Sequence, residues 1–335
     1  MFFKNFITIL TFLLGAVNEI NSECGCSQTN REERAKKYER TDEANENHFE
    51  SVLSHAKDFD KMSLIPGGKY FIGTNEQVFE TDREGPEREV EIKKFYIDKY
   101  EVSNQDFEDF VKDTGYVTEA ETFGDSFVFK ILISPEVQKE YEDFRVAQAP
   151  WWYKVKSVNW KQPEGKGSDI KDRMNHPVVH VSWNDAVAFC KSKTKRLPTE
   201  AEWEAACRGG KKRKLFPWGN LLMPNDKHFM NIWQGAFPDT NTNDDGEIST
   251  CAVDKYRQND FDLYNMVGNA WEWTSDLWND LNVAKEPENP ERTKKGGSYL
   301  CHKSYCYRYR CAARSQNSQD SSAGNLSFRC AKDFE

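Results

Sequence analysis

The sequence predicts an α+β fold in which short helices and short strands are separated by long irregular connections. Two early segments alternate between apolar and polar residues, as strands do. Three later segments have helical periodicity with recognisable capping residues. Connections rich in Gly, Pro, Asn and Asp, such as 217–220 and 240–246, occupy much of the remaining length. The content of regular structure is therefore low for a chain of 335 residues, and no tandem repeat is present.

The N-terminal part of the chain precedes the predicted folded region. Residues 1–22 have the three parts of a signal peptide: one base, an apolar run over 6–17, and small residues before the expected cleavage site. Residues 23–61 are polar and charged without a sustained period, which indicates a flexible arm. The folded domain is expected to occupy 62–335.

The composition excludes several classes of protein. A net charge of -9 and the absence of a basic tail argue against a general role on nucleic acids or membrane surfaces. No segment after the signal peptide approaches the ~20 apolar residues that a membrane helix needs. The mature chain suits one large domain or two small ones, and aromatic residues, 13% of the sequence, supply an ample core.

Three segments have the period of a strand. Residues 65–73 contain a Pro-Gly-Gly turn followed by a short apolar run, and residues 90–100 alternate between apolar and polar side chains. The Tyr-Arg-Tyr-Arg run at 307–310 also alternates at period two. We therefore expect strands in these three places.

Three other segments have the start and stop signals of helices. Ser103 is the expected N-cap of a helix over 105–112, and Gly115 ends it. A second helix is expected over 183–192. A third, over 199–207, begins with a Thr-x-x-Glu capping box.

The nine cysteines are expected to follow the chemistry of the secretory pathway, in which disulfides persist. An odd number leaves at least one thiol unpaired, or paired between chains. Cys24 and Cys26 lie near the start of the predicted arm, where exposed thiols exchange readily. A mixed disulfide with a partner, an internal bridge and a dimer link all remain open for this pair.

The stretch Gly296–Cys311 is the main candidate for a chemical site. Cys301, Cys306 and Cys311 recur every fifth residue among aromatic and basic side chains. This spacing fits neither one face of a strand nor one stripe of a helix, so we expect a loop that can bring two thiols together. Nearby bases, including His302, favour the thiolate, and thiolates favour Cu(I) or zinc. A structural disulfide, a metal site and a redox or nucleophilic pair remain the alternatives.

Two polar loops predict a site for a hard cation. Asn, Asp and Glu residues crowd 231–247, and 265–272 combines amides, a carboxylate and turn carbonyls. Calcium takes six to eight such oxygens, although loops of this composition also serve as plain turns. A zinc site at His176 and His180 is disfavoured because a proline between them indicates extended chain. A serine hydrolase centred on Ser298 lacks a nearby His–Asp partner.

Three motifs carry a family resemblance. Arg-Leu-Pro-Thr-Glu at 196–200 and Gly-Asn-Ala-Trp-Glu-Trp at 268–273 mark a wide superfamily, whereas the cysteine-containing run over 296–311 is more specific. Together they resemble the formylglycine-generating enzymes, or sulfatase-modifying factors, over residues 65–331. The two cysteines of the run separate the active type from a cysteine-poor paralogue of that family.

The resemblance implies a single α+β domain of low regular content, related to C-type lectin-like folds. It implies an oxidase of the endoplasmic reticulum that uses O2 and a thiol reductant. Its substrate would be the cysteine of a Cys-x-Pro-x-Arg segment in newly made sulfatases, converted to Cα-formylglycine. Cys301 and Cys306 match the two thiolates that hold Cu(I) in this family. Ser298, Trp271 and His302 match other residues of the catalytic pocket.

The resemblance also assigns residues around the pocket. Glu101 and Asp125 match acidic residues expected to meet the substrate arginine, while Asn325 and Arg314 match positions in the rim or support of the substrate site. The remaining matches are two disulfides and two calcium sites: Cys190 with Cys330 and Cys207 with Cys311; Asn231, Ile232, Asp245 and Glu247 for the first calcium ion; Asn265, Gly268, Ala270 and Glu272 for the second.

Several positions depart from the family pattern. Cys251 has no partner in it and is the odd thiol. The sequon at Asn325 falls beside the expected substrate groove, so we expect it to stay unmodified. The C-terminus is not a retention signal, so residence in the endoplasmic reticulum, as opposed to partial secretion, is expected to depend on a partner held through Cys24 and Cys26.

Two rival functions remain. The first is a non-catalytic, sulfatase-binding module of the endoplasmic reticulum in which Cys301 and Cys306 form a disulfide. The second is an iron-dependent sulfoxide synthase, which would need a facial set of histidines. His176, His180 and His302 do not provide a convincing set.

Overall fold

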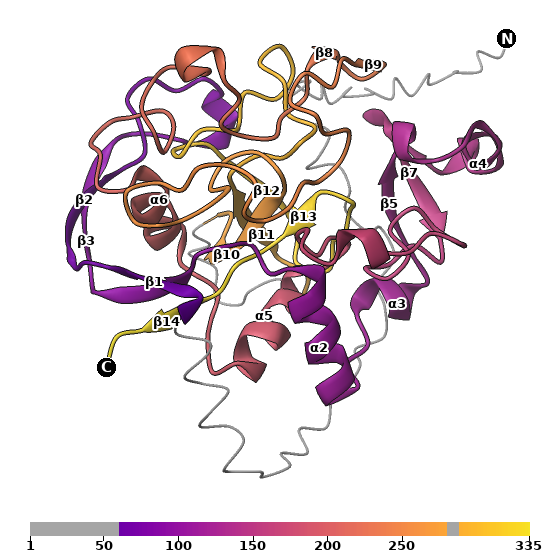
Figure 1. The fold of residues 1–335 in the computed structure, drawn as a ribbon, viewed down its shortest axis with the longest axis horizontal. Helices are drawn as coiled ribbons and strands as arrows, with labels where there is room; N and C mark the ends of the chain where they lie inside the picture. The colour runs from indigo at the N-terminus through magenta and orange to yellow at the C-terminus, as the bar shows by residue number, and fades with distance from the viewer. Residues whose placement is uncertain (1–59, 280–287) are drawn as a thin grey trace, which may run out of the picture.

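A four-stranded sheet with the order β12-β11-β10-β13 lies at the centre of the computed structural model (Figure 1), which describes residues 60–279 and 288–335. Its strands are β10 (Trp271–Leu277), β11 (Glu291–Lys295), β12 (Arg314–Ser318) and β13 (Leu326–Ser327). β11 runs antiparallel to β10 and β12, whereas β13 runs parallel to β10 and pairs Leu326 with Trp271. The loop with the predicted thiol site connects β11 to β12, so the central sheet holds both of its ends.

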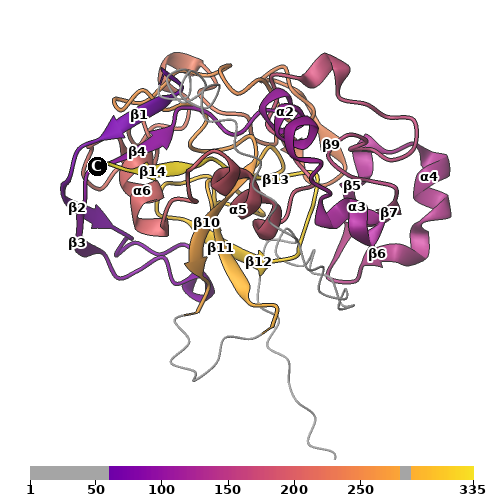
Figure 2. The ribbon, with the colours of Figure 1, turned by 90° about the horizontal axis from the view of Figure 1, so that it is seen from below.

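Four smaller sheets complete the strand topology. They are β1 (Met62–Ile65), β4 (Phe95–Asp98) and β14 (Ala331–Asp333); β2 (Gly68–Ile72) and β3 (Arg88–Ile92); β5 (Asp125–Phe129), β7 (Ala149–Lys156) and β6 (Arg145–Val146); and β8 (Gly235–Ala236) with β9 (Thr240–Asn241). Figure 2 shows the β2–β3 pair and the β5–β7–β6 sheet on opposite sides of the central sheet. Strands thus form where 65–73 and 90–100 predicted them.

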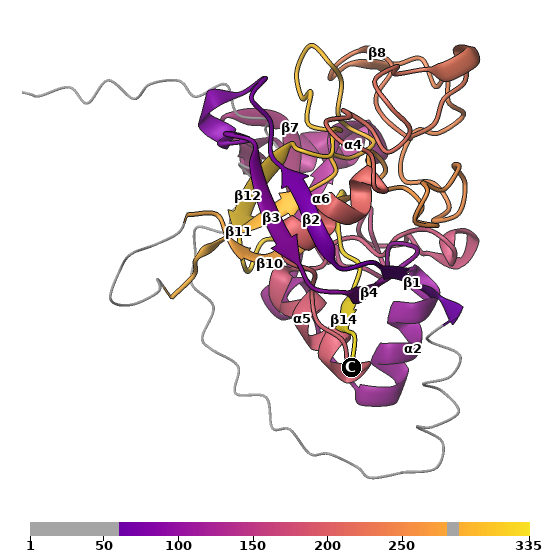
Figure 3. The ribbon, with the colours of Figure 1, turned by 90° about the vertical axis from the view of Figure 1, so that its left-hand side faces the viewer.

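The three predicted helices are confirmed. They are α2 (Asn104–Thr114), α5 (Trp183–Ser192) and α6 (Glu200–Arg208). Ser103, Ser182 and Thr199 each accept a hydrogen bond from a backbone N–H in the first turn, which satisfies one of the free donors at the helix start. Figure 3 shows α6 beside β2 and β3, which it contacts. The remaining short elements are α3 (Glu119–Phe123), α4 (Pro135–Glu140) and the 3-10 turns η2 (Glu80–Asp82), η3 (Lys130–Leu132), η4 (Glu142–Phe144), η5 (Lys171–Arg173) and η6 (Pro224–Asp226).

The strand predicted at 307–310 is wrong. This segment has no strand pairing, because both of its arginines point inward to buried carboxylates. Arg308 and Arg310 are each 1% exposed, and Tyr309 between them is also buried. The segment is therefore held by side-chain ion pairs in place of a ladder of backbone hydrogen bonds.

Aromatic residues dominate the main core, as the composition predicted. Phe107 of α2 and Phe189 of α5 stack with ring centroids 5.8 Å apart, and Phe328 packs edge-on against both. Two disulfides tie this core together: Cys190 of α5 with Cys330, and Cys207 of α6 with Cys311, each with Cα atoms 5.7 Å apart. The second bridge attaches the C-terminal end of the thiol loop to α6.

Several sequence predictions lie outside the described residues. The signal peptide, most of the arm over 23–61, and both Cys24 and Cys26 belong to this group. Lys61, the last residue of the predicted arm, forms an ion pair with Asp106 at 2.7 Å. Within 60–279 and 288–335, no helix has the length and apolar character needed to cross a membrane.

Candidate active site and cation-binding loops

Cys301 and Cys306 lie side by side in the loop between β11 and β12. Both side chains are fully buried, and their Cα atoms are 4.8 Å apart. The N–H of Cys306 donates to the carbonyl of His302 at 2.7 Å, and the N–H of Cys301 donates to the carbonyl of Ser298 at 2.9 Å. These turns fold the loop so that the two sulfur atoms meet. The arrangement suits either a disulfide or two thiolates on one soft metal ion.

Three of the predicted pocket residues are linked to this thiol loop by hydrogen bonds. The amide Nδ2 of Asn325 donates to Oγ of Ser298 at 3.0 Å. The N–H of Trp271 donates to the carbonyl of Asn325 at 2.9 Å. All three residues are fully buried, so the structure brings them together beneath the loop. The burial of Asn325 also fits the expectation that its sequon carries no glycan.

A cleft of about 690 Å³ lies next to the thiol loop, and His302 is one of the loop residues that line it. Met223, Met230 and Trp233 are among the apolar residues that line it. The N–H of Trp233 donates to the carbonyl of Cys301 at 3.1 Å, which joins this part of the lining to the loop. Nδ1 of His302 lies 2.7 Å from Oγ of Ser304. Neither cysteine is among the residues that line the cleft, and both cysteine side chains are fully buried.

Asp125 is the first residue of β5, and this strand lies beside the segment that leads to Asn325. The N–H of Gly324 donates to the carbonyl of Phe127 at 3.0 Å, which joins β5 to the segment before Asn325. The Asp125 side chain is 19% exposed, and its Oδ2 lies 3.6 Å from Nζ of Lys154. The Asp125 carboxylate is therefore partly exposed to solvent.

Two predicted substrate contacts are not supported. Glu101 is 1% exposed and accepts hydrogen bonds from Asn269 at 2.8 Å and Asn265 at 3.3 Å, so it cannot meet a substrate arginine without a rearrangement of the core. Arg314 donates two hydrogen bonds of 2.8 Å to the carboxylate of Glu200, and its side chain is 14% exposed. Arg314 therefore supports the central sheet from inside.

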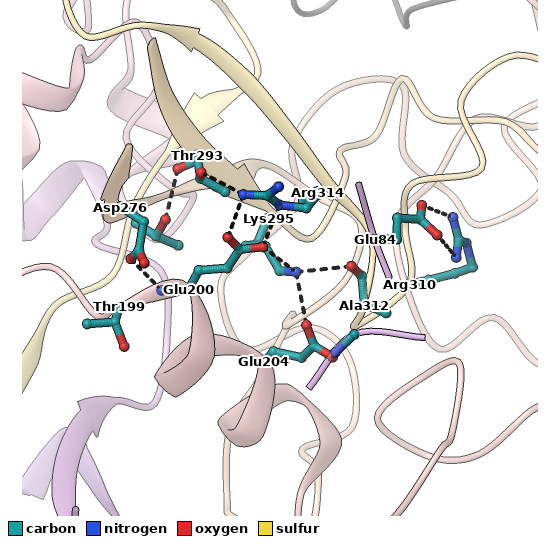
Figure 4. A network of polar contacts seen from close by, with 12 residues as sticks. Glu84, Thr199, Glu200, Glu204, Asp276, Thr293, Lys295, Arg310, Ala312 and Arg314 are labelled. Carbon is teal, nitrogen blue, oxygen red and sulfur yellow. Dashed lines mark hydrogen bonds and ion pairs between the residues drawn. The ribbon is translucent and has the colours of Figure 1, made fainter. Parts of the chain in front are cut away.

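Sequence analysis missed a set of buried ion pairs around the thiol loop. Nζ of Lys295 lies 3.2 Å from Glu204 and 3.4 Å from Glu200, with no exposure of the lysine side chain (Figure 4). Despite burial, Lys295 and Arg314 hold the pKa of Glu200 below its ordinary value. Arg310 pairs with Glu84 in the same view. No local pattern marks these pairs, because their partners are far apart in the sequence.

The first predicted calcium loop brings oxygen atoms together. The carbonyl of Ile232 and Oδ2 of Asp245 both accept hydrogen bonds from Nε2 of Gln234, the second at 3.0 Å. Oε1 of the same Gln234 is buried without a hydrogen-bond partner. Rotation of the Gln234 side-chain amide by 180° would exchange Nε2 and Oε1, and would place a third oxygen beside the Ile232 carbonyl and Oδ2 of Asp245. The donor set fits a hard cation, with Asn231 close by at 1% exposure.

Glu247 contributes differently to the first loop. Its carboxylate forms an ion pair with Lys255, whose Nζ also contacts the carbonyl of Asp245 at 3.1 Å. The side chain of Glu247 is thus already neutralised.

The second predicted calcium loop contains a buried amide among oxygens. Nδ2 of Asn265 lies 3.3 Å from Oε2 of Glu101, 3.3 Å from the carbonyl of Ala252 and 3.2 Å from that of Val253, while its Oδ1 has no partner. Burial raises the pKa of Glu101 to about 8. Four oxygens would converge after a half-turn of the amide, at spacings compatible with Ca–O distances of about 2.4 Å.

The other residues predicted for the second calcium site are Gly268, Ala270 and Glu272. Gly268 has φ +78°, and a Cβ there would lie 2.4 Å from the carbonyl oxygen of Asn231, so only glycine fits. Ala270 is buried on the same loop. Both carboxylate oxygens of Glu272 accept hydrogen bonds of 2.7 Å from Arg329. Glu101 is therefore better placed than Glu272 to supply a carboxylate next to Asn265.

Known proteins are similar to this chain over most of its length. Residues 48–334 match the family model described as the sulfatase-modifying factor enzyme 1-like domain. The chain is 58% identical over 280 residues to a formylglycine-generating enzyme of Bos taurus, with 82% of this chain and 75% of the relative covered. It is 50% identical over 284 residues to the enzyme of the same name from Thermomonospora curvata, with 81% and 93% covered.

The chain belongs to the formylglycine-generating enzyme family.

This family also contains an inactive relative from Bos taurus, the inactive C-alpha-formylglycine-generating enzyme 2, which is 43% identical over 273 residues. It covers 81% of this chain and 87% of its own length, and its identity is lower than that of the two enzymes named above. Membership of the family therefore does not by itself assign activity to this chain. The two buried cysteines, Cys301 and Cys306, are the residues that the sequence resemblance associates with the active type.

Solved structures support the fold. PvdO from Pseudomonas aeruginosa has a TM-score of 0.57 at 21% identity, with 82% of this chain and 94% of PvdO covered. CarF has a TM-score of 0.51 at 18% identity, with 82% and 98% covered. The α+β fold of the formylglycine-generating enzyme family predicted from the sequence is thus confirmed.

Proposed function

We propose that this protein oxidises the cysteine of a Cys-x-Pro-x-Arg segment in newly made sulfatases to Cα-formylglycine. The observation that carries this proposal is the adjacent, fully buried pair Cys301 and Cys306 in a chain of the formylglycine-generating enzyme family. A general oxidase would not need two buried thiols at one point of a loop.

The reaction balances with O2 as oxidant and two equivalents of a thiol as reductant. The cysteine side chain is oxidised to a thioaldehyde, which water hydrolyses to the aldehyde with release of the sulfur as hydrogen sulfide. O2 is reduced to water, and the two reductant thiols become one disulfide. Two electrons come from the substrate carbon and two from the reductant, which matches the four electrons that O2 accepts.

Cu(I) is the cofactor that fits the thiol pair. Two thiolates from one loop are soft ligands, and soft ligands favour Cu(I) over hard cations. When bound, Cu(I) would supply the one-electron chemistry through which O2 reacts. Cys301 and Cys306 would hold it, and the substrate cysteine would supply a third sulfur. Among the described residues, no cluster of three His, Cys, Asp or Glu side chains offers an alternative site for a metal.

The surrounding residues orient the loop and exclude water. Asn325 holds Oγ of Ser298, and the carbonyl of Ser298 accepts from the N–H of Cys301. Trp271 packs beneath, without exposure to solvent. Because these groups are buried, the electrostatic environment of the sulfurs is set by protein dipoles and not by bulk water.

Asp125 is proposed to bind the substrate arginine. A carboxylate–guanidinium pair is charge-assisted and therefore stronger than a neutral hydrogen bond. Lys154, at 3.6 Å, would exchange places with the incoming arginine. His302 is proposed to contact the bound segment from the cleft side.

Mass spectrometry of a Cys-x-Pro-x-Arg peptide tests the proposal. The peptide would be incubated with mature protein, Cu(I), O2 and a thiol reductant, and we expect a copper-dependent loss of about 18 Da, the change from thiol to aldehyde. Cys301→Ser and Cys306→Ser are expected to abolish this loss while the fold is retained. Cys251→Ala, which removes a buried thiol elsewhere, is the matched control and is expected to retain activity.

The rival function predicts another outcome. The Cα separation of 4.8 Å also permits a Cys301–Cys306 disulfide, as in a non-catalytic sulfatase-binding module. An unchanged peptide that still binds the reduced, copper-loaded protein would favour that module. Unfolding of both serine variants would show that the pair is structural.

Calcium is proposed at the two oxygen-rich loops. The supporting observations are the buried, partnerless Oε1 of Gln234 and Oδ1 of Asn265, each beside other oxygen atoms. Thermal unfolding in EGTA and in millimolar Ca2+ tests this: calcium should raise the midpoint, and Asn265→Ala should lose the part of that rise due to the second loop. An equal rise in both proteins would remove Asn265 from the site.

We place this activity in the lumen of the endoplasmic reticulum, because the predicted signal peptide directs the chain there. Cys24 and Cys26 are proposed to hold a retention partner through mixed disulfides. Expression of the Cys24→Ser, Cys26→Ser double variant in secreting cells should raise the fraction of protein in the medium. An unchanged fraction would exclude this mode of retention.

A further inference from the structure

Two buried ion pairs connect the end of the thiol loop to a segment 226 residues earlier. Arg308 donates to Asp82 through Nε at 2.5 Å and Nη2 at 2.9 Å. Arg310 donates to Glu84 through Nη1 at 2.9 Å and through Nη2. None of the four side chains is more than 5% exposed. Each pair is bidentate, which fixes orientation as well as distance.

The carboxylates that hold the two arginines are themselves fixed. The N–H of Thr74 donates to the carbonyl of Glu84 at 3.0 Å. A Cβ at Gly73 would lie 2.7 Å from that carbonyl oxygen, and one at Gly85 would lie 2.3 Å from the carbonyl oxygen of Thr74. The backbones at 73–74 and 84–85 therefore touch directly. These contacts hold the backbone that carries Glu84, and Asp82 lies two residues before it on the same segment.

The other end of the thiol loop is held by the same part of the structure. Lys295, three residues before Ser298, lies 3.2 Å from Oε2 of Glu204 on α6 (Figure 4). Oε1 of Glu204 accepts from the N–H of Gly73 at 2.8 Å. One helix and one short segment thus anchor the chain immediately before and immediately after the two cysteines.

The two anchored ends also touch each other. A Cβ at Gly297 would lie 3.0 Å from the backbone N and Cα of Tyr309, so the chain before Ser298 packs against the chain between Arg308 and Arg310. A displacement of either arginine is therefore transmitted to Gly297 and Ser298. Ser298 in turn holds Cys301 through its carbonyl.

We infer that Asp82 and Glu84 are positioning residues that set the spacing of the Cys301 and Cys306 sulfurs. The inference deepens the proposed copper-dependent function and rests on it for the role of the spacing. Partners that hydrogen-bond directly to metal ligands typically change metal affinity 10- to 100-fold when altered, and Asp82 and Glu84 act one step further away, through Arg308 and Arg310. Asp82 and Glu84 act from a segment that contains no cysteine and contacts no predicted substrate residue in the described part of the chain.

Glu84→Asp is the test, because it keeps the charge and shortens the side chain by one methylene. We expect the Cu(I) affinity to fall by about 10-fold, the lower end of the range for groups bonded directly to metal ligands, measured by competition with a chromogenic chelator. The peptide KM should stay unchanged while kcat falls. Glu87→Asp is the matched control: Glu87 lies on the same segment but pairs with Arg213, whose side chain is 63% exposed, so both values should stay at the wild-type level.

A second readout does not depend on copper. The equilibrium between the Cys301–Cys306 dithiol and its disulfide, measured in glutathione buffers, also reports the spacing of the sulfurs. Glu84→Asp should shift this equilibrium constant at least several-fold, and Glu87→Asp should not. If the wild-type protein binds no Cu(I), the proposed function fails, but this measurement still decides the positioning role.

Three outcomes would overturn the inference. The first is a folded Glu84→Asp protein with wild-type Cu(I) affinity and a wild-type thiol–disulfide equilibrium. If Glu84→Asp does not fold, Glu84→Met with Arg310→Leu takes its place, since an apolar pair of similar volume leaves no buried charge unpaired. The second outcome is a double variant whose Cu(I) affinity and thiol–disulfide equilibrium constant equal those of the wild-type protein. Failure of both variants to fold is the third, because the pair would then serve folding alone.

Discussion

Replacement of Arg329 by methionine is expected to lower the free energy of unfolding by about 3–5 kcal/mol, because it leaves the buried Glu272 carboxylate without its cation. Arg329 is fully buried and donates to both oxygens of Glu272 at 2.7 Å. Methionine fills much of the same volume, so the loss of charge and of donors, and not a cavity, determines the cost.

The remaining contacts of Arg329 set the size of the effect. Its guanidinium also donates to the carbonyls of Asp98, Lys99 and Tyr264, at 3.2, 2.9 and 2.8 Å. A buried acceptor that loses its donor costs about 1–3 kcal/mol. Trp203 still donates to Glu272 at 2.7 Å, which offsets part of the loss. The expected change is a large fraction of the ~5–15 kcal/mol that stabilises a typical domain.

Urea unfolding with the disulfides intact provides the assay. Arg213→Met is the control, because Arg213 also forms a bidentate pair but is 63% exposed, and exposed pairs contribute about 0–1 kcal/mol. The double variant Glu272→Leu, Arg329→Met should be more stable than Arg329→Met alone, since it removes the unpaired charge. Equal losses for Arg329→Met and Arg213→Met, or a double variant less stable than either single one, would refute the reasoning.

Three further predictions follow from the described contacts. Burial and the neighbouring Asp185 raise the pKa of Glu119 from 4.5 to about 7. The contribution of Glu119 to stability is therefore complete below pH 4.5 and is lost as the pH rises through 7. Glu119→Gln should flatten the pH dependence of the urea midpoint between these values, and an unchanged slope would contradict this. Gly268→Ala should destabilise the fold by at least about 1 kcal/mol and weaken calcium binding, because the new Cβ meets the Asn231 carbonyl; a normal calcium-dependent rise in melting midpoint would argue against it. Asp125→Ala should weaken binding of an arginine-containing peptide more than of its Arg→Ala form, and equal losses in a titration would remove Asp125 from that role.

The elements that the sequence predicted correctly are those specified by neighbouring residues. The helix at α6 follows from Thr199 and Glu202, which are three residues apart and bond each other's backbone N–H. Gly115, in a left-handed conformation, ends α2 for an equally local reason. The thiol loop was also predictable, because a five-residue spacing excludes a single face of any regular element.

The errors concern charged residues whose partners are remote. The family resemblance assigned Glu101 to the substrate arginine, but its carboxylate accepts hydrogen bonds from Asn265 and Asn269, which lie 164 and 168 residues away. The alternation at 307–310 predicted a strand, but the arginines there pair with carboxylates 226 residues away. Sequence periodicity distinguishes apolar from polar positions; it does not distinguish a solvated charge from a buried and paired one.

The buried pairs also change the expected chemistry of the cysteines. The sequence suggested that nearby bases lower the pKa of the thiols, because cations stabilise a thiolate. In the structure Arg308 and Arg310 are each matched by one carboxylate, so each pair adds little net charge near Cys306. It follows that the two arginines act on the site through geometry more than through charge.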